Sequence, residues 1–207
     1  LHTADEVEKL QTALEGTGVT IKPARENPLD SIWPDQPATP MGKAFVHPVE
    51  LAGESHADKR ARLAEGLRKA GQKAAVVTLP DSLCWLLNVR GADVPKNPVL
   101  HGFAVLKDDG RVDLFVNPAK LDDAVGAHLG ADVKVHPVEG FGDALKGLTG
   151  PVRVDKGTAP LAVSDILKGA GVEVVWGDDP CRLPKACKNA AEIQATREAH
   201  LRDGAAM

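Results

Sequence analysis

Between residues 55 and 175 the chain alternates short apolar runs of strand length with amphipathic segments of helical spacing. Ser55 and Asp58 form an N-cap pair, and the apolar residues that follow recur on one face until Gly71, which predicts a helix. The uninterrupted apolar run 74–79 is typical of a strand that is buried on both faces of a sheet. This alternation constrains the fold more than any other feature of the sequence.

Five more strands follow the first. The Asp108-Asp109-Gly110 segment predicts a hairpin between two of them. Helices are predicted between most of the others, including one opened by Asn117-Pro118 in the order expected of an N-cap and a first helical residue. The six predicted strands lie near residues 74–79, 103–106, 112–116, 133–135, 152–154 and 172–175. Together these elements predict an α/β fold with a mostly parallel sheet, helices on both faces, and a mixed character from the hairpin.

The segments on either side of this region read as parts of other units. Residues 1–22 hold a helix with a capping box at Thr3 and Glu6 and a short strand at Val19 and Ile21, a pair that cannot bury its apolar face alone. Residues 23–54 are rich in proline, which disfavours helix and central strand and predicts a linker of polyproline II character, with Trp33 pinned onto a neighbour. The expected organisation is a domain tail at 1–22, a linker at 23–54, a main domain at 55–180 and the start of a further domain at 181–207.

Composition excludes several classes of function. The 207 residues carry a formal net charge of −4, which argues against a nucleic-acid groove, and no long apolar stretch suits a signal peptide or a membrane span. The cysteines are odd in number and form no C-x-x-C pair, so neither a disulfide framework nor a thiolate zinc site is indicated. We therefore expect a soluble, cytoplasmic protein that binds neither nucleic acid nor a membrane.

No common catalytic motif is present. The chain lacks the G-x-S-x-G elbow, the Walker loop, G-x-G-x-x-G and H-E-x-x-H. Its seven histidines are dispersed. His56 with Asp58 suggests a fragment of a metal site, but a residue in the first turn of a helix is better explained as solvated. Cys181 and Cys187 have no nearby histidine that would generate a thiolate nucleophile.

The strongest functional candidate is the stretch from Ser82 to Leu106. An apolar helical turn around Trp85 ends at Asn88 and gives way to a polar loop between two buried elements, where scaffolds commonly present function. Arg90 has two readings: it offers its fork of donors to a carboxylate or carbonyl, or it bonds Asp93 or loop carbonyls and simply shapes the loop. Spacing alone favours the second reading. The candidate substrate or interface residues are Asn88, Arg90, Asp93, Asn97 and His101.

Three segments together resemble the three-domain form of aminopeptidase P, the Xaa-Pro aminopeptidase of the creatinase/prolidase family. They are ENPLDSIWPDQP at the linker, WLLNVRGADVPKNPV from Trp85 to Val99, and KNAAEIQATREAHLRDGAA from Lys188. They come in the family's order, and the resemblance covers essentially the whole chain. It implies the end of a first domain, a complete second domain with the creatinase N-terminal fold, and the first helix of a catalytic domain.

That family removes the residue before a proline by using two metal ions, usually manganese, held by aspartates, glutamates and a histidine. In the family these ligands lie beyond the segment that resembles Lys188 onward, so none can be placed here. The resemblance implies that this span binds no metal and is inactive alone. It further implies that the span supports its own catalytic domain, a homodimer contact and the entrance for peptides with proline in second position.

Two alternatives stay open. The first is an interaction module, a creatinase-like domain without peptidase activity that binds a protein or peptide partner. An exposed apolar patch or a charged extension would favour it, and no charged tail is visible. The second is a small hydrolase of another kind, which the lack of a nucleophile and base disfavours.

Overall fold

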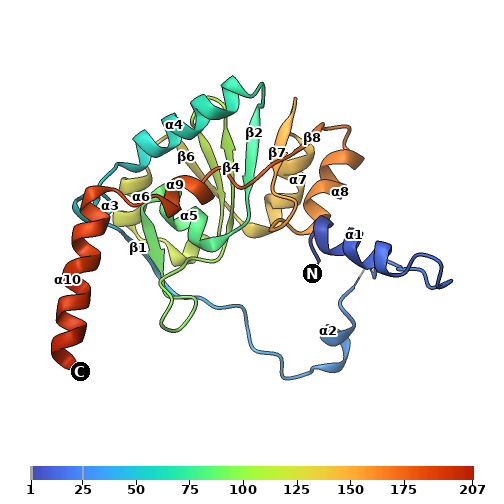
Figure 1. Cartoon of the computed structure of the whole chain (residues 1–207), viewed down its shortest axis with the longest axis horizontal. Helices are drawn as coiled ribbons and strands as arrows, with labels where there is room; N and C mark the ends of the chain where they lie inside the picture. Colours follow the sequence, from blue (N-terminus) through green and yellow to red (C-terminus); the bar gives the residue numbers. More distant parts are fainter. Residues whose placement is uncertain (1, 25) are drawn as a thin grey trace.

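A single six-stranded sheet organises the computed structural model, which describes residues 2–24 and 26–207 (Figure 1). The strand order is β6-β5-β4-β2-β7-β8. β4 runs antiparallel to both of its neighbours, β2 and β5, while the other three pairings are parallel. The predicted mixed, mostly parallel sheet with one hairpin is therefore confirmed. The strands are β2 (Ala74–Val77), β4 (Phe103–Lys107), β5 (Val112–Phe115), β6 (Val133–His136), β7 (Val152–Val154) and β8 (Val174–Trp176).

Helices cover both faces of the sheet, as predicted. Alternate residues of β2 point to opposite sides, so Ala75 and Val77 enter one core and Ala74 and Val76 another. All four are buried, and this makes β2 the centre of the fold. The first core is shared with α4 (His56–Lys69), α5 (Pro80–Leu87) and α6 (Asp123–Leu129), and the second with α7 (Phe141–Lys146) and α8 (Leu161–Gly169).

Two helix starts show how far local patterns specify this fold. α4 begins as predicted, with the hydroxyl of Ser55 accepting a hydrogen bond from the Asp58 N–H at 3.1 Å. The single helix predicted from Asn117 is wrong. A short 3₁₀ turn, η1 (Pro118–Lys120), ends at the extended residue Leu121, and α6 starts only after Asp122, whose carboxylate accepts from the Val125 N–H at 2.9 Å. A second capping residue thus restarts the chain as a new helix. A further 3₁₀ turn, η2 (Val138–Gly140), precedes α7.

The proline-rich segment is more structured than predicted. It contains a helix, α2 (Pro28–Ile32), so the prediction that this segment forms no helix is wrong. It also contains a strand, β1 (Ala44–Val46), which lies in a two-stranded sheet and is not a central strand. Asn27 caps α2 and proline occupies its first position, where the missing N–H costs no hydrogen bond. β1 pairs antiparallel with β3 (Val89–Gly91) in a separate two-stranded sheet. Trp33 is 46% exposed, so it does not pin the segment as predicted.

At the amino-terminal end, α1 (Ala4–Ala13) has the predicted capping box between Thr3 and Glu6. The predicted strand at Val19 and Ile21 is wrong. Both residues are exposed, and neither belongs to the two sheets of the described part of the chain. Strand propensity without a partner for its backbone groups does not produce a strand.

At the carboxyl-terminal end, α10 (Ala190–Ala206) projects from the body of the molecule (Figure 1). Its capping box joins Asn189 and Glu192, and the Asn189 amide donates to the carbonyl of Ala52 at 2.7 Å. Ala52 is the last residue of α3 (Val49–Ala52). α10 has no fully buried residue, and its partly buried residues lie in its first six positions, so the rest of the helix is exposed.

Candidate functional site

Asn88 begins the candidate loop in a left-handed conformation (φ 49°, ψ 47°) that ends α5. Asparagine tolerates this conformation better than most residues. Asn88 is only 1% exposed, and its side chain points inward. Oδ1 accepts from the ammonium of Lys59 at 2.7 Å, and Nδ2 donates to the carbonyl of Glu54 at 2.9 Å. Asn88 therefore fixes the start of the loop from inside the molecule.

Lys59, on α4, is the interior partner of Asn88. Its ammonium also donates to the carbonyl of Trp85 at 3.1 Å and lies 4.4 Å from the centroid of the Trp85 ring. No carboxylate among the described residues lies within ion-pair distance of it, and burial lowers its pKa to about 8. This lysine supplies positive charge to the carbonyl end of α5, where a cation is favoured.

Asp93 is the buried anchor in the middle of the loop. Its carboxylate receives hydrogen bonds from the ammonium of Lys120 at 2.8 Å to both oxygens, from the Gly42 N–H at 3.0 Å and from the His101 N–H at 2.7 Å. Burial alone raises the pKa of Asp93, but these hydrogen bonds outweigh it, so the pKa is lowered. The carboxylate ties together the linker, the loop and the turn after β5.

Arg90 lies on β3, opposite Phe45 of β1. Its Nη1 donates to the carbonyls of Val89 at 2.9 Å and Cys84 at 3.4 Å, and it does not bond Asp93. The loop carbonyls are one of the two structural partners that the spacing predicted. Burial lowers the pKa of the half-buried guanidinium without making it neutral. Part of its fork of donors remains accessible at the surface of the small sheet.

The last two candidates lie nearer to solvent. Asn97 is exposed at the tip of the loop, where its N–H donates to the carbonyl of Val94 at 3.2 Å. His101 is half-buried, and its backbone is held by Asp93. The structure therefore brings the five candidates onto one loop but divides their roles. Asn88 and Asp93 face inward, while Arg90, Asn97 and His101 reach the surface.

Sequence reasoning missed Lys59 and Lys120, the two cations that hold this loop. Both lysines are buried and bind a side chain of the loop. Lys59 lies 29 residues from its partner Asn88 in the sequence, and Lys120 lies 27 residues from its partner Asp93. Lysine is rarely buried without a reason. Lys59 lies four residues before Leu63, on the apolar face of its helix, so helical spacing could have indicated its burial. The sequence around Lys120 carries no such sign. Only the three-dimensional arrangement reveals the pairs.

His56 is not solvated as predicted. Its ring packs against that of His128 with centroids 4.7 Å apart, and its Nε2 lies 3.0 Å from the His128 carbonyl. Within residues 2–24 and 26–207 no three His, Cys, Asp or Glu side chains gather as a set of metal ligands, so these residues do not fit a two-metal site. Nor does any helix in this part of the chain have the length and apolar character needed to cross a bilayer.

The sequence matches the creatinase/prolidase N-terminal domain over residues 35–192. Similar curated proteins are the probable Xaa-Pro aminopeptidases P of Coccidioides posadasii, 36% identical over 217 residues, and of Laccaria bicolor, 34% identical over 215 residues. In both cases the alignment covers 100% of this chain and 33% of the relative. The chain thus spans about a third of the length of these relatives.

The chain also resembles part of each of two larger proteins of known structure. The X-prolyl aminopeptidase of Caenorhabditis elegans, described as a cytosolic enzyme with a di-nuclear active site, superposes with a TM-score of 0.90 at 28% identity, covering 100% of this chain and 34% of that one. The Xaa-Pro dipeptidase of Bacillus anthracis gives a TM-score of 0.53 at 16% identity over 68% of this chain and 38% of that one, a likeness of fold alone.

Proposed function

This chain belongs to the creatinase/prolidase N-terminal domain family, and we propose that it is a non-catalytic, supporting segment of an Xaa-Pro aminopeptidase. The observation that carries the proposal is the superposition of the whole chain on about a third of the nematode enzyme with a TM-score of 0.90. The parent enzyme would remove the residue before a proline. We propose a cytoplasmic location for it, since the nematode enzyme is described as cytosolic.

The side chains present in this segment suit a supporting role and not metal binding. Two-metal hydrolysis requires a cluster of carboxylates and histidines to hold the ions and activate a water. The described residues offer no such cluster, so the metal ions, which we expect to be manganese, belong to the remainder of the parent enzyme. This segment then contributes shape and contacts. The proposed units are the tail at 1–22, the linker at 23–54, the domain at 55–180 and the start of the catalytic domain at 181–207.

Within this proposal the loop from Asn88 to His101 borders the substrate entrance. Arg90 and Asn97 are its accessible polar side chains, and a guanidinium suits the carbonyl or carboxylate groups of a peptide. Asn88 and Asp93 would act indirectly, by holding the loop in place through Lys59 and Lys120. A homodimer contact remains a prediction that the resemblance alone supports.

A chimera tests the proposal directly. The matching third of the nematode aminopeptidase is replaced by this chain, and hydrolysis of a peptide with proline in second position is measured with manganese present. We expect the chimera to retain activity, while the 207-residue chain with manganese gives no turnover above the blank. Arg90→Ala in the chimera is expected to raise KM about tenfold with a smaller change in kcat, as loss of a charge-assisted hydrogen bond to substrate predicts.

Arg111→Ala is the matched control, because Arg111 lies in an exposed pair with Asp109 on the β4–β5 hairpin. Turnover by the chain alone would contradict the proposal. A chimera that folds and binds two manganese ions yet has no activity would also contradict it, and would favour the interaction module without peptidase activity.

A further inference from the structure

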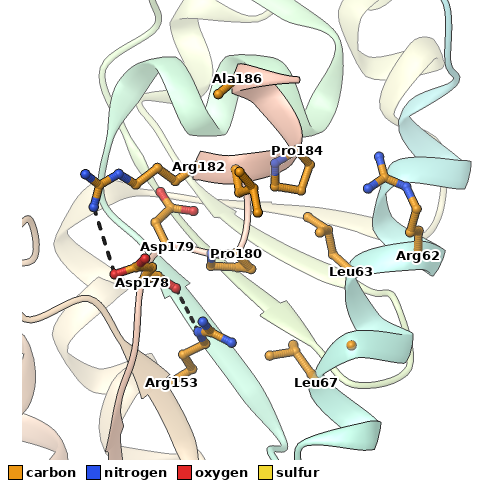
Figure 2. A pocket seen from close by; sticks show the side chains of 12 residues that line it. Arg62, Leu63, Leu67, Arg153, Asp178, Asp179, Pro180, Arg182, Pro184 and Ala186 are labelled. Atoms are coloured by element: carbon orange, nitrogen blue, oxygen red, sulfur yellow. Dashed lines mark hydrogen bonds and ion pairs between the residues drawn. The ribbon is translucent and has the colours of Figure 1, made fainter. Parts of the chain in front are cut away.

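An open groove lies between α4 and the segment 178–186, which ends in α9 (Arg182–Ala186) (Figure 2). Its volume is about 680 Å³, within the range of about 300–1,000 Å³ typical of ligand sites. Leu63 and Leu67 of α4 form one wall, and Pro180 and Pro184 form the other. The walls are therefore apolar, and the prolines make one of them rigid.

The floor of the groove carries an uncompensated cation, Arg153 of β7. Its Nε donates to the carbonyl of Asp178 at 2.7 Å, which fixes the guanidinium plane. Its terminal amino groups have no hydrogen-bond partner in the described part of the chain, and they point toward the space between Pro180 and Leu67 (Figure 2). Gly177 makes room for this arrangement, since a Cβ there would lie 3.1 Å from the Arg153 Nε.

The other two arginines of the groove already have carboxylate partners, and Asp179 is buried. Arg62 makes a bidentate pair with Glu54, at 3.1 and 2.8 Å. Arg182 lies 3.9 Å from the carboxylate of Asp178. Asp179 is buried, its Oδ1 accepts a hydrogen bond from the Cys181 N–H at 2.8 Å, and burial raises its pKa. The free positive charge at the centre of the groove is thus that of Arg153.

Gly66 of α4 lies at the edge of the groove, where a side chain added to it would have room. A Cβ at this position would meet no atom within 4 Å, so the space above it is open. The position lies one residue before Leu67 and lines the groove.

We propose that this groove binds an acidic peptide segment, with a glutamate or aspartate carboxylate on the Arg153 guanidinium and a neighbouring apolar residue between the leucines and prolines. The two free amino groups of Arg153 match the two oxygens of a carboxylate. The apolar side of the groove favours a peptide over an inorganic anion, because Leu183 beside Pro184 is 72% exposed and a phosphate or chloride ion gains nothing from burying it. Leu63 and Leu67 are already buried and only shape the opposite wall. The volume also exceeds what a single small anion fills.

The test is fluorescence anisotropy of a fluorescein-labelled Leu-Glu-Leu-Glu-Leu peptide titrated with the 207-residue chain at about 0.15 M salt. Saturable binding is expected, and the same peptide with glutamine in place of glutamate should bind at least about tenfold more weakly. Inorganic phosphate should compete only at concentrations far above those of unlabelled peptide. Equal affinity of the two peptides, or no saturable binding, would overturn the proposal.

Three glycine variants locate the site without removing any contact. Gly66→Glu places a carboxylate in the groove and should weaken binding about tenfold or more, while Gly66→Gln, of the same size, should weaken it much less. Gly126→Glu is the matched control, because Gly126 is also an exposed helical glycine, on α6, where an added Cβ would meet nothing within 4 Å. Arg153→Gln should abolish the preference for glutamate over glutamine. An equal effect of Gly126→Glu and Gly66→Glu would show that net charge, not the groove, governs binding, and would overturn the proposal.

Discussion

Asp93 and Lys120 form the most deeply buried ion pair among the described residues, with side-chain exposures of 0% and 3%. Removing one partner of such a pair leaves the other charge buried and unpaired, which typically costs about 3–5 kcal/mol. We expect Lys120→Met to lower the free energy of unfolding by about this amount, as measured by urea denaturation. Because Asp93 holds the loop backbone at His101, the loop should also become mobile.

Lys146→Met is the matched control for this prediction. Lys146 pairs with Asp143 at the same distance of 2.8 Å, but both side chains are exposed. An exposed pair contributes about 0–1 kcal/mol, so the control variant should unfold almost as the parent does. Similar losses in the two variants would show that burial does not set the strength of the Asp93–Lys120 pair.

Lys59 predicts a dependence of stability on alkaline pH. Burial lowers its pKa from 10.5 to about 8, so between these values the unfolded chain binds more protons than the folded chain. The contribution of Lys59 to the free energy of unfolding therefore rises with pH from about 8 to about 10.5 and is constant below pH 8. Relative to Lys59→Met, the parent should gain up to about 3 kcal/mol across this window.

Urea denaturation of the parent and of Lys59→Met at several pH values between 7 and 10.5 measures the difference between their free energies of unfolding. Other titrating groups contribute equally to both proteins and cancel in this difference. Lys69→Met, which removes an exposed lysine from the same helix, controls for the loss of one positive charge. A difference between parent and Lys59→Met that is flat or falls with pH would contradict the lowered pKa.

At the scale of elements, local patterns predict what local interactions stabilise. The N-cap of α4, the hairpin and the six strands follow from short stretches of sequence, and each is confirmed. The pairing of β1 with β3 does not follow, because each strand has three residues and they lie more than 40 residues apart. The sequence likewise gives the candidate loop but not its partners, since Lys120 reaches Asp93 only through the fold.

The crossing of the linker over the loop depends on one small residue, Gly42. A Cβ at this position would lie 2.2 Å from the carbonyl carbon of Ala92 and 2.6 Å from the Asp93 nitrogen, and both atoms belong to the backbone. Gly42→Ala must therefore push the two segments apart and weaken the bond from the Gly42 N–H to Asp93. We expect a loss of about 2 kcal/mol or more in the free energy of unfolding, measured by urea denaturation.

Gly140→Ala provides the comparison. Gly140 has φ −76° and ψ −6°, which any residue adopts, and a Cβ there would meet nothing within 4 Å. This variant should keep or slightly raise the stability of the parent, because alanine loses less backbone entropy on folding. A Gly42→Ala protein as stable as Gly140→Ala would mean that the crossing relaxes without cost.

At the scale of the whole molecule, a well-packed sheet carries two loosely attached arms (Figure 1). Residues 17–24 and 26–41 are exposed almost throughout, and α10 buries none of its side chains. The apolar side chains on these arms include Leu29, Ile32 and Leu201, each more than half exposed. An arrangement of this kind fits a segment that completes its packing against other parts of a parent enzyme, as the proposed function requires.

Hydrogen exchange should therefore separate α10 from the sheet. An isolated helix shorter than about 12–15 residues is marginal in water, and α10 beyond its first turn has only its own hydrogen bonds. In the 207-residue chain we expect amides of residues 196–206 to exchange within seconds to minutes, while those of β2 exchange only on global unfolding. Asn189→Ala removes both the cap and the bond to Ala52, so it should extend fast exchange to the first turn and leave β2 unchanged. Protection of residues 196–206 equal to that of β2 would show that α10 is held by packing, and the view of this helix as an arm awaiting a partner surface would fail.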